Sequence, residues 1–225
     1  MNAKQIASLP KSDIVWLASH RCSHGHTYLS HYECYKKEVL GGQADRIGFF
    51  DIESSGLEAN FAIMFSYAIL DEQGEVHGRT VTQDEVKSGV WDYQLCKELV
   101  DDFRKFDKII GYYIKDRRFD LPFVRSRCMH HGIDFPKYGE LKIQDLYDSV
   151  KNKMKLRRSG LVNACEFLGI KSKGHPLDFN VWLKAWQGDP KTLNYIWTHN
   201  VEDVESTRDL YNRVKDYTRK SNTSI

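Results

Sequence analysis

Apolar positions change their spacing several times along the chain, and each change marks a predicted element. From residue 46 to residue 82 they form short dense runs that predict three strands, at 46–53, 60–71 and about 74–82, with "DEQG" (71–74) as the second turn. The pattern then becomes helical, with apolar residues at Leu95, Leu99, Phe103 and Phe106. A meander of three strands followed by an amphipathic helix is therefore expected.

Strand and helix patterns alternate after residue 106. "DKIIGYYI" (107–114) predicts a buried strand, "LPFVRSRCMHHG" (121–132) predicts a helix with proline near its first turn, and a short strand is expected around 141–144. The last third is predicted to be helical throughout, with helices capped by Ser159, Asp178 and Asp189. This order of elements predicts an α/β domain with a mixed sheet.

The composition is that of an ordinary globular protein: the 225 residues are 41% hydrophobic and 28% charged, with a net charge of +2. This length allows one domain with a substantial core and a short appendage, and the composition excludes coiled coils, collagen and disordered chains. The longest apolar stretch, "FAIMFSYAIL" (61–70), is about half the length of a membrane-spanning helix, and the N-terminus lacks the apolar segment of a secretory signal. The odd number of cysteines, five, argues against a disulfide framework. We therefore expect a soluble cytoplasmic protein with reduced thiols and no membrane partner.

Residues 1–45 are predicted to form a separate N-terminal segment ahead of a main domain at 46–220, with a short helix near Ser12, a Cys/His-rich stretch and a break at "GGQ" (41–43). The Cys/His-rich stretch, "CSHGHTYLSHYEC" (22–34), holds five candidate zinc ligands: Cys22, His24, His26, His31 and Cys34. A tetrahedral Cys₂His₂ site with one structural Zn²⁺ would stabilise a segment that has little core of its own. The spacing matches no familiar zinc module, and histidines in loops commonly only hydrogen-bond, so both interpretations stand.

Two acids lie at the end of the first predicted strand, in "FFDIESSGL" (49–57). Alternate side chains of a strand share a face, so Asp51 and Glu53 should point the same way. Two carboxylates that close repel each other, and either a raised pKa on one of them or a bound cation relieves the repulsion. Oxygen ligands suit Mg²⁺ or Mn²⁺. The alternative is an exposed strand end whose acids are only solvated.

Two further acids lie where predicted elements begin or meet. Asp120 in "RRFDLPF" precedes a helix that follows a central strand, a position that faces the C-terminal edge of the sheet. Asp203 in "HNVEDVEST" lies in the middle of a helix, with His199 one turn earlier on the same face. Taken singly, Asp120 could be a helix cap and Asp203 a surface residue.

The three segments that carry these acids resemble the exonuclease motifs of the DEDD (DnaQ-like) superfamily, 3′-5′ exonucleases with a ribonuclease H-like fold. The resemblance covers about residues 46–215, and the first two motifs are closest to the branch found in family-B DNA polymerases. It implies an α/β fold with a ribonuclease H-like mixed five-stranded sheet flanked by helices, and a 3′-5′ exonuclease that hydrolyses phosphodiester bonds at nucleic acid ends. It further implies that two divalent ions, Mg²⁺ or Mn²⁺, are held by four carboxylates: Asp51, Glu53, Asp120 and Asp203.

Other positions follow from the same resemblance or depart from it. Leu57 matches an apolar residue that wedges near the terminal base, and Asn60 and Phe61 would line the same pocket. The third motif, "HNVED", has the spacing of the Tyr-x-x-x-Asp kind with histidine in the place of tyrosine, which makes His199 a candidate general base. Lys115 stands where related domains often carry asparagine, five residues before the acid of the second motif. These departures leave the choice between DNA and RNA open.

Basic residues accompany the acidic motifs. Residues 151–173 contain seven Lys or Arg against one acid, Glu166, and a second basic cluster lies at 114–127. Such stretches are either solvated surface or contacts for the phosphates of a nucleic acid. The candidate contacts are Lys115, Lys153, Lys155, Arg157 and Arg158.

Two other functions are compatible with these motifs. Ribonuclease H-like sheets also serve structure-selective endonucleases, and a nucleic-acid-binding module with a silent nuclease centre would keep the same fold. All four acids are present, which argues against a silent centre. Because the chain shows no polymerase domain, we expect an exonuclease that acts alone or with a partner such as a polymerase or another repair or processing protein.

Overall fold

The computed structural model divides the chain into two compact units, Met1–Asp45 and Arg46–Ile225. The residues that it describes are 9–39, 45–171, 176–218 and 223–224. The break expected at "GGQ" (41–43) and the last basic residue of the 151–173 stretch, Lys173, lie outside them. Among the described helices, none combines the length and the apolar character that crossing a membrane would require.

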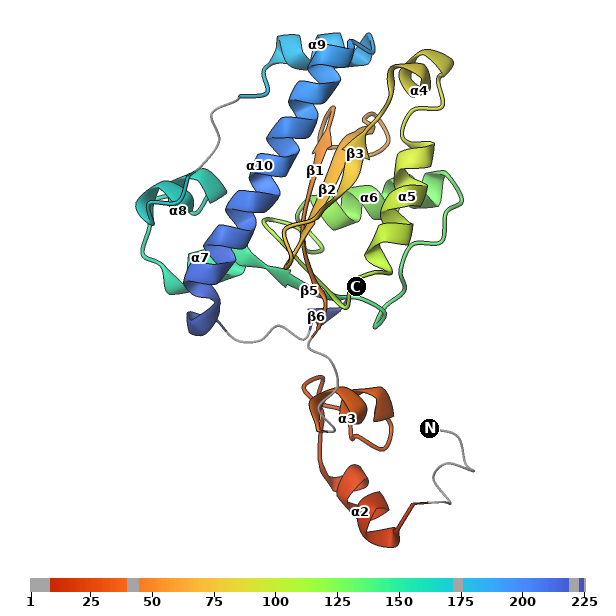
Figure 1. Cartoon of the computed structure of the whole chain (residues 1–225), viewed down its shortest axis with the longest axis vertical. Coiled ribbons are helices and arrows are strands. Elements are labelled where there is room, and N and C mark those ends of the chain that lie inside the picture. Colours follow the sequence, from red (N-terminus) through yellow and green to blue (C-terminus); the bar gives the residue numbers. More distant parts are fainter. Residues whose placement is uncertain (1–8, 40–44, 172–175, 219–222, 225) are drawn as a thin grey trace. The chain divides into compact units, whose positions relative to one another are not determined.

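The larger unit is built on a mixed sheet with the strand order β3-β2-β1-β4-β5-β6 (Figure 1). Its strands are β1 (Ile47–Ser54), β2 (Met64–Asp71), β3 (Val76–Thr80), β4 (Lys108–Gly111), β5 (Lys142–Asp145) and β6 (Thr223–Ser224). The first three strands form an antiparallel meander, and β4 and β5 join β1 in parallel. The predicted mixed five-stranded sheet is confirmed, and the two-residue β6 extends its edge in antiparallel orientation.

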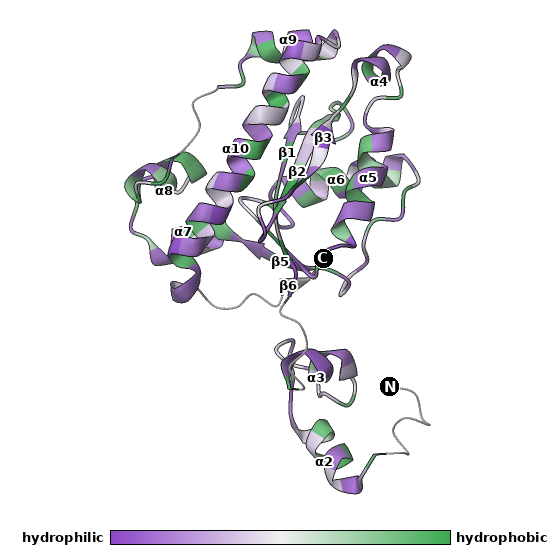
Figure 2. Cartoon of the chain, viewed as in Figure 1, coloured by the Kyte–Doolittle hydropathy of each residue, from purple (hydrophilic) through white to green (hydrophobic). Residues whose placement is uncertain are grey.

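Helices cover both faces of this sheet. They are α4 (Gln83–Ser88), α5 (Tyr93–Phe103), α6 (Asp120–His130), α7 (Leu146–Lys153), α8 (Leu161–Phe167), α9 (Phe179–Trp186), α10 (Pro190–Val214) and the 3₁₀ helix η1 (Lys215–Tyr217). One core cluster joins the sheet to α4, α5, α6, α9 and the first half of α10, and the other joins it to α7, α8 and the second half of α10. In Figure 1, α10 runs beside the strands of the sheet. In Figure 2, α5 and α10 alternate hydrophobic with hydrophilic residues along their length.

Alternation along β1 decides where its acids point. Phe50 and Ile52 belong to the cluster that includes α5 and α6, whereas Phe49 belongs to the other cluster, with the second half of α10. Because alternate side chains of a strand share a face, Asp51 and Glu53 continue the face of Phe49. Both acids therefore point toward the helix that carries the third motif.

Several element boundaries differ from the sequence expectation. β2 begins at Met64 and not at residue 60, because the amides of Phe61 and Ala62 both donate to the Glu58 carbonyl at 2.9 Å and close a turn. Likewise, α5 ends at Phe103, so the apolar residue at position 106 packs into the core from the following loop. In each case a hydrophobic residue that continued the apolar pattern belongs to a turn or loop.

Side-chain hydrogen bonds account for other differences. β4 ends at Gly111 and not at residue 114, because the Asp145 carboxylate accepts from the amides of Tyr113 at 2.9 Å and Lys115 at 3.1 Å and draws the chain away from the sheet. α8 begins after Gly160, so Ser159 is not its cap. The sequence analysis missed α4, although Thr82 and Glu85 form a capping box at its start.

Among its described residues the smaller unit has the helices α2 (Lys11–Ser19) and α3 (Tyr32–Glu38). The short helix expected near Ser12 is present, and α3 begins within the Cys/His-rich stretch. Between them, a bridge of antiparallel type joins Arg21 to Thr27. The core cluster of the unit has three buried members among the described residues: Leu17, Cys22 and Tyr28. This core is small for an independently folded unit.

Candidate active site

Asp51 is held by a buried side chain of α10. Asn200 Nδ2 donates to Asp51 Oδ2 at 2.8 Å, and Ser66 Oγ on β2 donates to Asn200 Oδ1 at 2.9 Å. Because the serine hydroxyl occupies the carbonyl side of the amide, the NH₂ group faces the carboxylate. The three residues thus form a chain of hydrogen bonds from β2 through α10 to β1.

The sequence analysis missed Asn200, although a signal was present. The apolar stripe of α10 includes Leu193, Ile196 and Val204, and Asn200 falls on this stripe at the helical interval of four residues. The structure buries Asn200 completely. A polar residue at a core position of a helix must find hydrogen-bond partners, and here one partner is an acid of the first motif.

His199 lies between two of the acids. Its Nε2 atom is 3.3 Å from Glu53 Oε1 and 3.8 Å from Asp203 Oδ2, and the three side chains bring their ligand atoms within 4.8 Å of one another. The helix places His199 and Asp203 one turn apart, and both are buried. This arrangement links the end of β1 to the middle of α10.

Asp120 is the first residue of α6 and is buried. Burial raises the pKa of its carboxyl well above the ordinary range, and the negative charges of Asp51, Glu53 and Asp145 raise it further. Its Oδ2 atom has no hydrogen-bond partner among the residues that the structure describes. A buried carboxylate oxygen beside other acids is a group that a cation would stabilise.

The four acids fit a divalent cation site. They come from β1, α6 and α10. Asp120 is near enough to Asp51 and Glu53 for their charges to raise its pKa. His199 lies within 4 Å of both Glu53 and Asp203. Carboxylate oxygens form a hard donor set of the kind that Mg²⁺ and Mn²⁺ accept. The orphaned oxygen of Asp120 is the observation of this structure that favours such an ion.

Asp145 orders the loop that leads to Asp120. Besides accepting from the amides of Tyr113 and Lys115, its carboxylate lies 2.6 Å from Nη1 of Arg118, and its side chain is fully buried. Two residues of this loop, Tyr113 and Arg117, have positive φ angles of 72° and 65°, which non-glycine residues rarely adopt. A loop with such backbone angles must be held in place by contacts with the surrounding structure, and Asp145 supplies several of these contacts.

The sequence analysis did not assign Asp145 to the site. Its local signal was that of a helix cap, and it does accept from the Tyr147 amide at the start of α7 at 3.0 Å. Its contacts to residues 113–118 depend on β4 and β5 being paired in parallel, which brings the ends of the two strands together. That pairing is not visible in the local pattern.

The loop between β1 and β2 carries the residues expected to touch a terminal base. Leu57 and Phe61 are each 81% exposed, and Asn60 is exposed too. The loop is tied to the core, because Ser55 exchanges hydrogen bonds with Ile63 at 3.1 Å. Two large apolar side chains are thus presented to solvent directly after the strand that carries the first two acids.

The candidate phosphate contacts divide into two groups. Lys115 Nζ is paired with Asp148 at 3.0 Å. The other four are exposed and lie at the end of α7 or in the segment between α7 and α8: Lys153, Lys155, Arg157 and Arg158.

In the smaller unit, four of the five candidate zinc ligands come together: Cys22, His24, His31 and Cys34. His26 is exposed and lies outside this group, with its ring centroid 4.5 Å from that of His31.

Comparison with known proteins agrees with this architecture. A family model described as the RNase_H superfamily matches residues 48–215. Among solved structures, the chain is similar to the family B DNA polymerase from the hyperthermophilic archaeon Pyrobaculum calidifontis, with a TM-score of 0.63 and 18% identity over 78% of this chain and 25% of that chain. It is also similar to a product-bound exonuclease I, with a TM-score of 0.51 and 14% identity over 78% of this chain and 46% of that one.

These matches show the fold, and the resemblance to ribonuclease H-like exonucleases is confirmed at that level. The chain spans a quarter of the length of the polymerase and less than half that of the exonuclease. A comparison with curated proteins finds no match.

Proposed function

The chain belongs to the RNase_H superfamily, and we propose that it is a metal-dependent 3′-5′ exonuclease that acts on single-stranded ends of DNA or RNA. Membership of this superfamily supports a nuclease activity without specifying its direction or its substrate. The observation that carries the finer proposal is the convergence of four acids from three elements. Asp120 Oδ2 is buried without a hydrogen-bond partner among the described residues, and the charges of Asp51 and Glu53 raise the pKa of this carboxyl.

Asp51, Glu53, Asp120 and Asp203 would hold two ions of Mg²⁺ or Mn²⁺. Such ions lower the pKa of a water nucleophile and stabilise the negative charge that develops on the phosphate and the leaving oxygen. The protein contributes a fixed geometry: Asn200 orients Asp51, and Asp145 orders the loop before Asp120. These contacts would hold Asp51 and the segment that carries Asp120 in place before substrate binds.

His199 is proposed to accept the proton of the attacking water at Nε2. This atom faces the acidic cluster at 3.3 Å from Glu53 Oε1, so a proton taken there would be stabilised by the neighbouring carboxylate. Burial of the ring fixes its orientation, and its position one turn before Asp203 keeps it beside the same acids.

Substrate contacts are proposed at two surfaces. The exposed side chains of Leu57 and Phe61 would pack against the terminal base, since apolar contact with the face of a base does not depend on which base it is. The four exposed basic residues after α7 would contact phosphates without reading sequence: Lys153, Lys155, Arg157 and Arg158. A polymerase or another processing protein that leaves frayed ends is the class of partner that this activity would serve.

The test compares end-labelled linear and circular single strands, in both DNA and RNA, with Mg²⁺ or Mn²⁺. A 3′-5′ exonuclease releases the label of a 3′-labelled strand as a mononucleotide at once, shortens a 5′-labelled strand to a ladder and leaves circles intact. Cleavage of circles would instead establish the structure-selective endonuclease. Binding of single strands without hydrolysis of any substrate would establish the silent binding module, and the Asp51→Ala variant, purified in parallel, controls for contaminating nucleases.

A further inference from the structure

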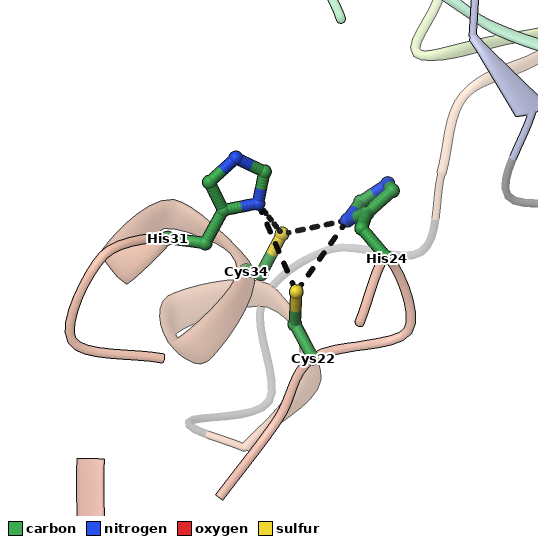
Figure 3. Close-up of side chains that lie close together, drawn as sticks. All are labelled: Cys22, His24, His31 and Cys34. Carbon is green, nitrogen blue, oxygen red and sulfur yellow. Dashed lines mark hydrogen bonds between the residues drawn. The ribbon is translucent and has the colours of Figure 1, made fainter. Parts of the chain in front are cut away.

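Two thiols and two imidazoles converge on one point in the smaller unit (Figure 3). Cys22 Sγ lies 3.7 Å from Nδ1 of both His24 and His31. Cys34 Sγ lies 3.2 Å from Nδ1 of His24 and 3.6 Å from Nδ1 of His31. Each sulfur therefore contacts each nitrogen, and all four atoms lie within 4.8 Å of one another.

Hydrogen bonds alone do not account for these four contacts. Each Nδ1 atom either carries one proton or offers one lone pair, and each thiol has one proton to donate. With two imidazoles and two thiols, proton positions permit two well-formed hydrogen bonds. The remaining sulfur–nitrogen contacts need another source of attraction.

From this geometry we infer that the N-terminal unit binds one Zn²⁺ through Cys22, His24, His31 and Cys34. Zinc bonds of about 2.3 Å to sulfur and about 2.0–2.1 Å to nitrogen, arranged tetrahedrally, place sulfur and nitrogen about 3.5–3.6 Å apart. The four observed separations, 3.2–3.7 Å, bracket this value. Two thiolates with two imidazoles form a donor set that suits Zn²⁺ better than Mg²⁺ or Mn²⁺.

Local structure delivers these ligands in two pairs. The first pair lies in the turn that the Arg21–Thr27 bridge closes, where the Gly25 amide donates to the Cys22 carbonyl at 2.9 Å and Gly25 has a φ of +83°. A positive φ favours glycine at this position, and the turn leaves Cys22 and His24 on the same side. His24, the residue before this glycine, therefore points toward the other three ligands.

The second pair lies at the start of α3. His31 precedes the first residue of this helix, and the Cys34 amide donates to the His31 carbonyl at 2.9 Å, which places the two ligands one turn apart. Glu38 at the other end of α3 braces the turn, since it accepts from the Ser23 amide at 3.1 Å and from the Tyr28 hydroxyl at 2.9 Å. The turn and the helix thus approach each other from two sides of the ligand cluster.

The proposed site is structural. Four protein ligands close a tetrahedral zinc site and leave no position for water or substrate. With three buried residues in its described core cluster, the unit has little apolar burial to stabilise it, and zinc binding contributes folding free energy to such small units. The inference concerns residues of the smaller unit alone, so it stands or falls independently of the proposed nuclease activity.

Elemental analysis of the full chain, purified without chelator under reducing conditions, tests the site. We expect about one zinc per chain, lost in the Cys22→Ser, Cys34→Ser double variant and kept in His26→Ala, the matched control. Because the serine variant could simply unfold the unit, a second measurement uses the wild-type protein with Co²⁺ in place of zinc. Thiolate-to-cobalt charge-transfer bands and the strong visible bands of a tetrahedral ion are expected.

The His31→Cys variant sharpens the test. It should keep one metal per chain and show stronger charge transfer, because a third thiolate replaces an imidazole. Wild-type protein that contains no zinc, gives only the weak spectrum of octahedral cobalt, or carries a disulfide between Cys22 and Cys34 after reducing purification would overturn the inference. Loss of zinc in the His26→Ala variant alone would overturn the choice of ligands.

Discussion

Asn200 donates a hydrogen bond to Asp51 across 149 positions of sequence, from Nδ2 to Oδ2 at 2.8 Å. Ser66 holds the other side of the same amide at 2.9 Å, so the carboxylate of the first motif is oriented by a residue of α10 that stands directly after His199. The helix of the third motif therefore contributes more than its own acid and histidine: it also positions the acid on β1.

Replacing Asn200 by alanine should slow catalysis while the fold survives. The change removes the donor to Asp51 and one of the two acceptors of Ser66 Oγ, which keeps only the Arg79 carbonyl at 3.3 Å. Loss of an outer-shell hydrogen bond costs roughly 10- to 100-fold in metal affinity or activity, so a higher Mg²⁺ requirement or a lower kcat is expected. Metal titrations of the cleavage rate measure it, with Asn194→Ala on an exposed position of α10 as the control. A variant with the metal dependence of the wild type would show that Asn200 is only a core residue.

The Asp51→Ala and Asp203→Ala variants should lose Mg²⁺- or Mn²⁺-dependent cleavage and keep their binding to single strands. Each change removes a proposed metal ligand without touching the exposed basic residues. The measurements are hydrolysis of a 3′-labelled strand, circular dichroism and a binding titration. Glu205→Ala, on an exposed position of the same helix as Asp203, is the control. Near wild-type hydrolysis in either aspartate variant would refute the metal assignment.

Replacing His199 by alanine should reduce kcat roughly 10²- to 10⁴-fold, the usual contribution of a general base, with little change in KM. The His199→Tyr variant restores the Tyr-x-x-x-Asp motif and should recover part of the activity, because tyrosine can orient the water without taking its proton. Steady-state kinetics at saturating metal separate the two parameters. If the alanine variant were as fast as the wild type, His199 would be a structural partner of Glu53 and no base.

The stability of the larger unit should depend on pH through Asp92. This buried carboxylate accepts from the Met64 amide at 2.9 Å and from Arg127 Nη2 at 2.7 Å, and it lies 2.8 Å from His131 Nε2. Burial alone would raise the pKa of Asp92, but the hydrogen bonds from Arg127, Met64 and His131 outweigh it and lower the pKa. A carboxyl whose pKa is lower in the folded than in the unfolded protein stabilises the fold at pH values above its unfolded-state pKa of about 3.9. This stabilisation is lost as the pH falls through the lower folded-state pKa.

The Asp92→Asn variant isolates this contribution. At pH 7 it should reduce the free energy of unfolding by about 3 kcal/mol, since Arg127 is left buried without its carboxylate. The difference in free energy of unfolding between the variant and the wild type should narrow below about pH 4, where Asp92 begins to take up a proton. Urea unfolding at several pH values measures this difference. The control is Asp101→Asn on α5, which removes an exposed ion pair with Arg104. A difference that did not change with pH would contradict the assignment.

Neutralising the basic residues after α7 should weaken single-strand binding similarly for all sequences. The variant changes Lys153, Lys155, Arg157 and Arg158 to glutamine. Each phosphate contact releases counterions, so the slope of log K against log salt should fall by about 0.7 per lost contact. A variant with the same number of changes at distant exposed lysines, such as Lys87 and Lys97 on α4 and α5, should keep the slope. An unchanged slope in the first variant would assign those residues to ordinary surface.

Features with a fixed local period could be predicted from the sequence. The two-residue period of β1 implied that Asp51 and Glu53 share a face, and the helical period of α10 implied that His199 lies above Asp203. The first five strands of the sheet also followed from local patterns, while their ends did not. The turn at Phe61 and the loop after Gly111 are closed by hydrogen bonds from backbone amides, which the apolar pattern does not show.

What the tertiary structure decided is which distant groups meet. Asn200 reaches Asp51 only because α10 packs on the face of β1 that carries the acids, and Asp145 reaches the loop before Asp120 only because β4 and β5 are parallel neighbours. In the smaller unit, the sequence contains five candidate zinc ligands. The turn at Gly25 and the start of α3 bring four of them together. The sequence determined these residue types and their local faces because backbone periods act over a few residues. Their partners were decided by packing between elements, which depends on the whole chain at once.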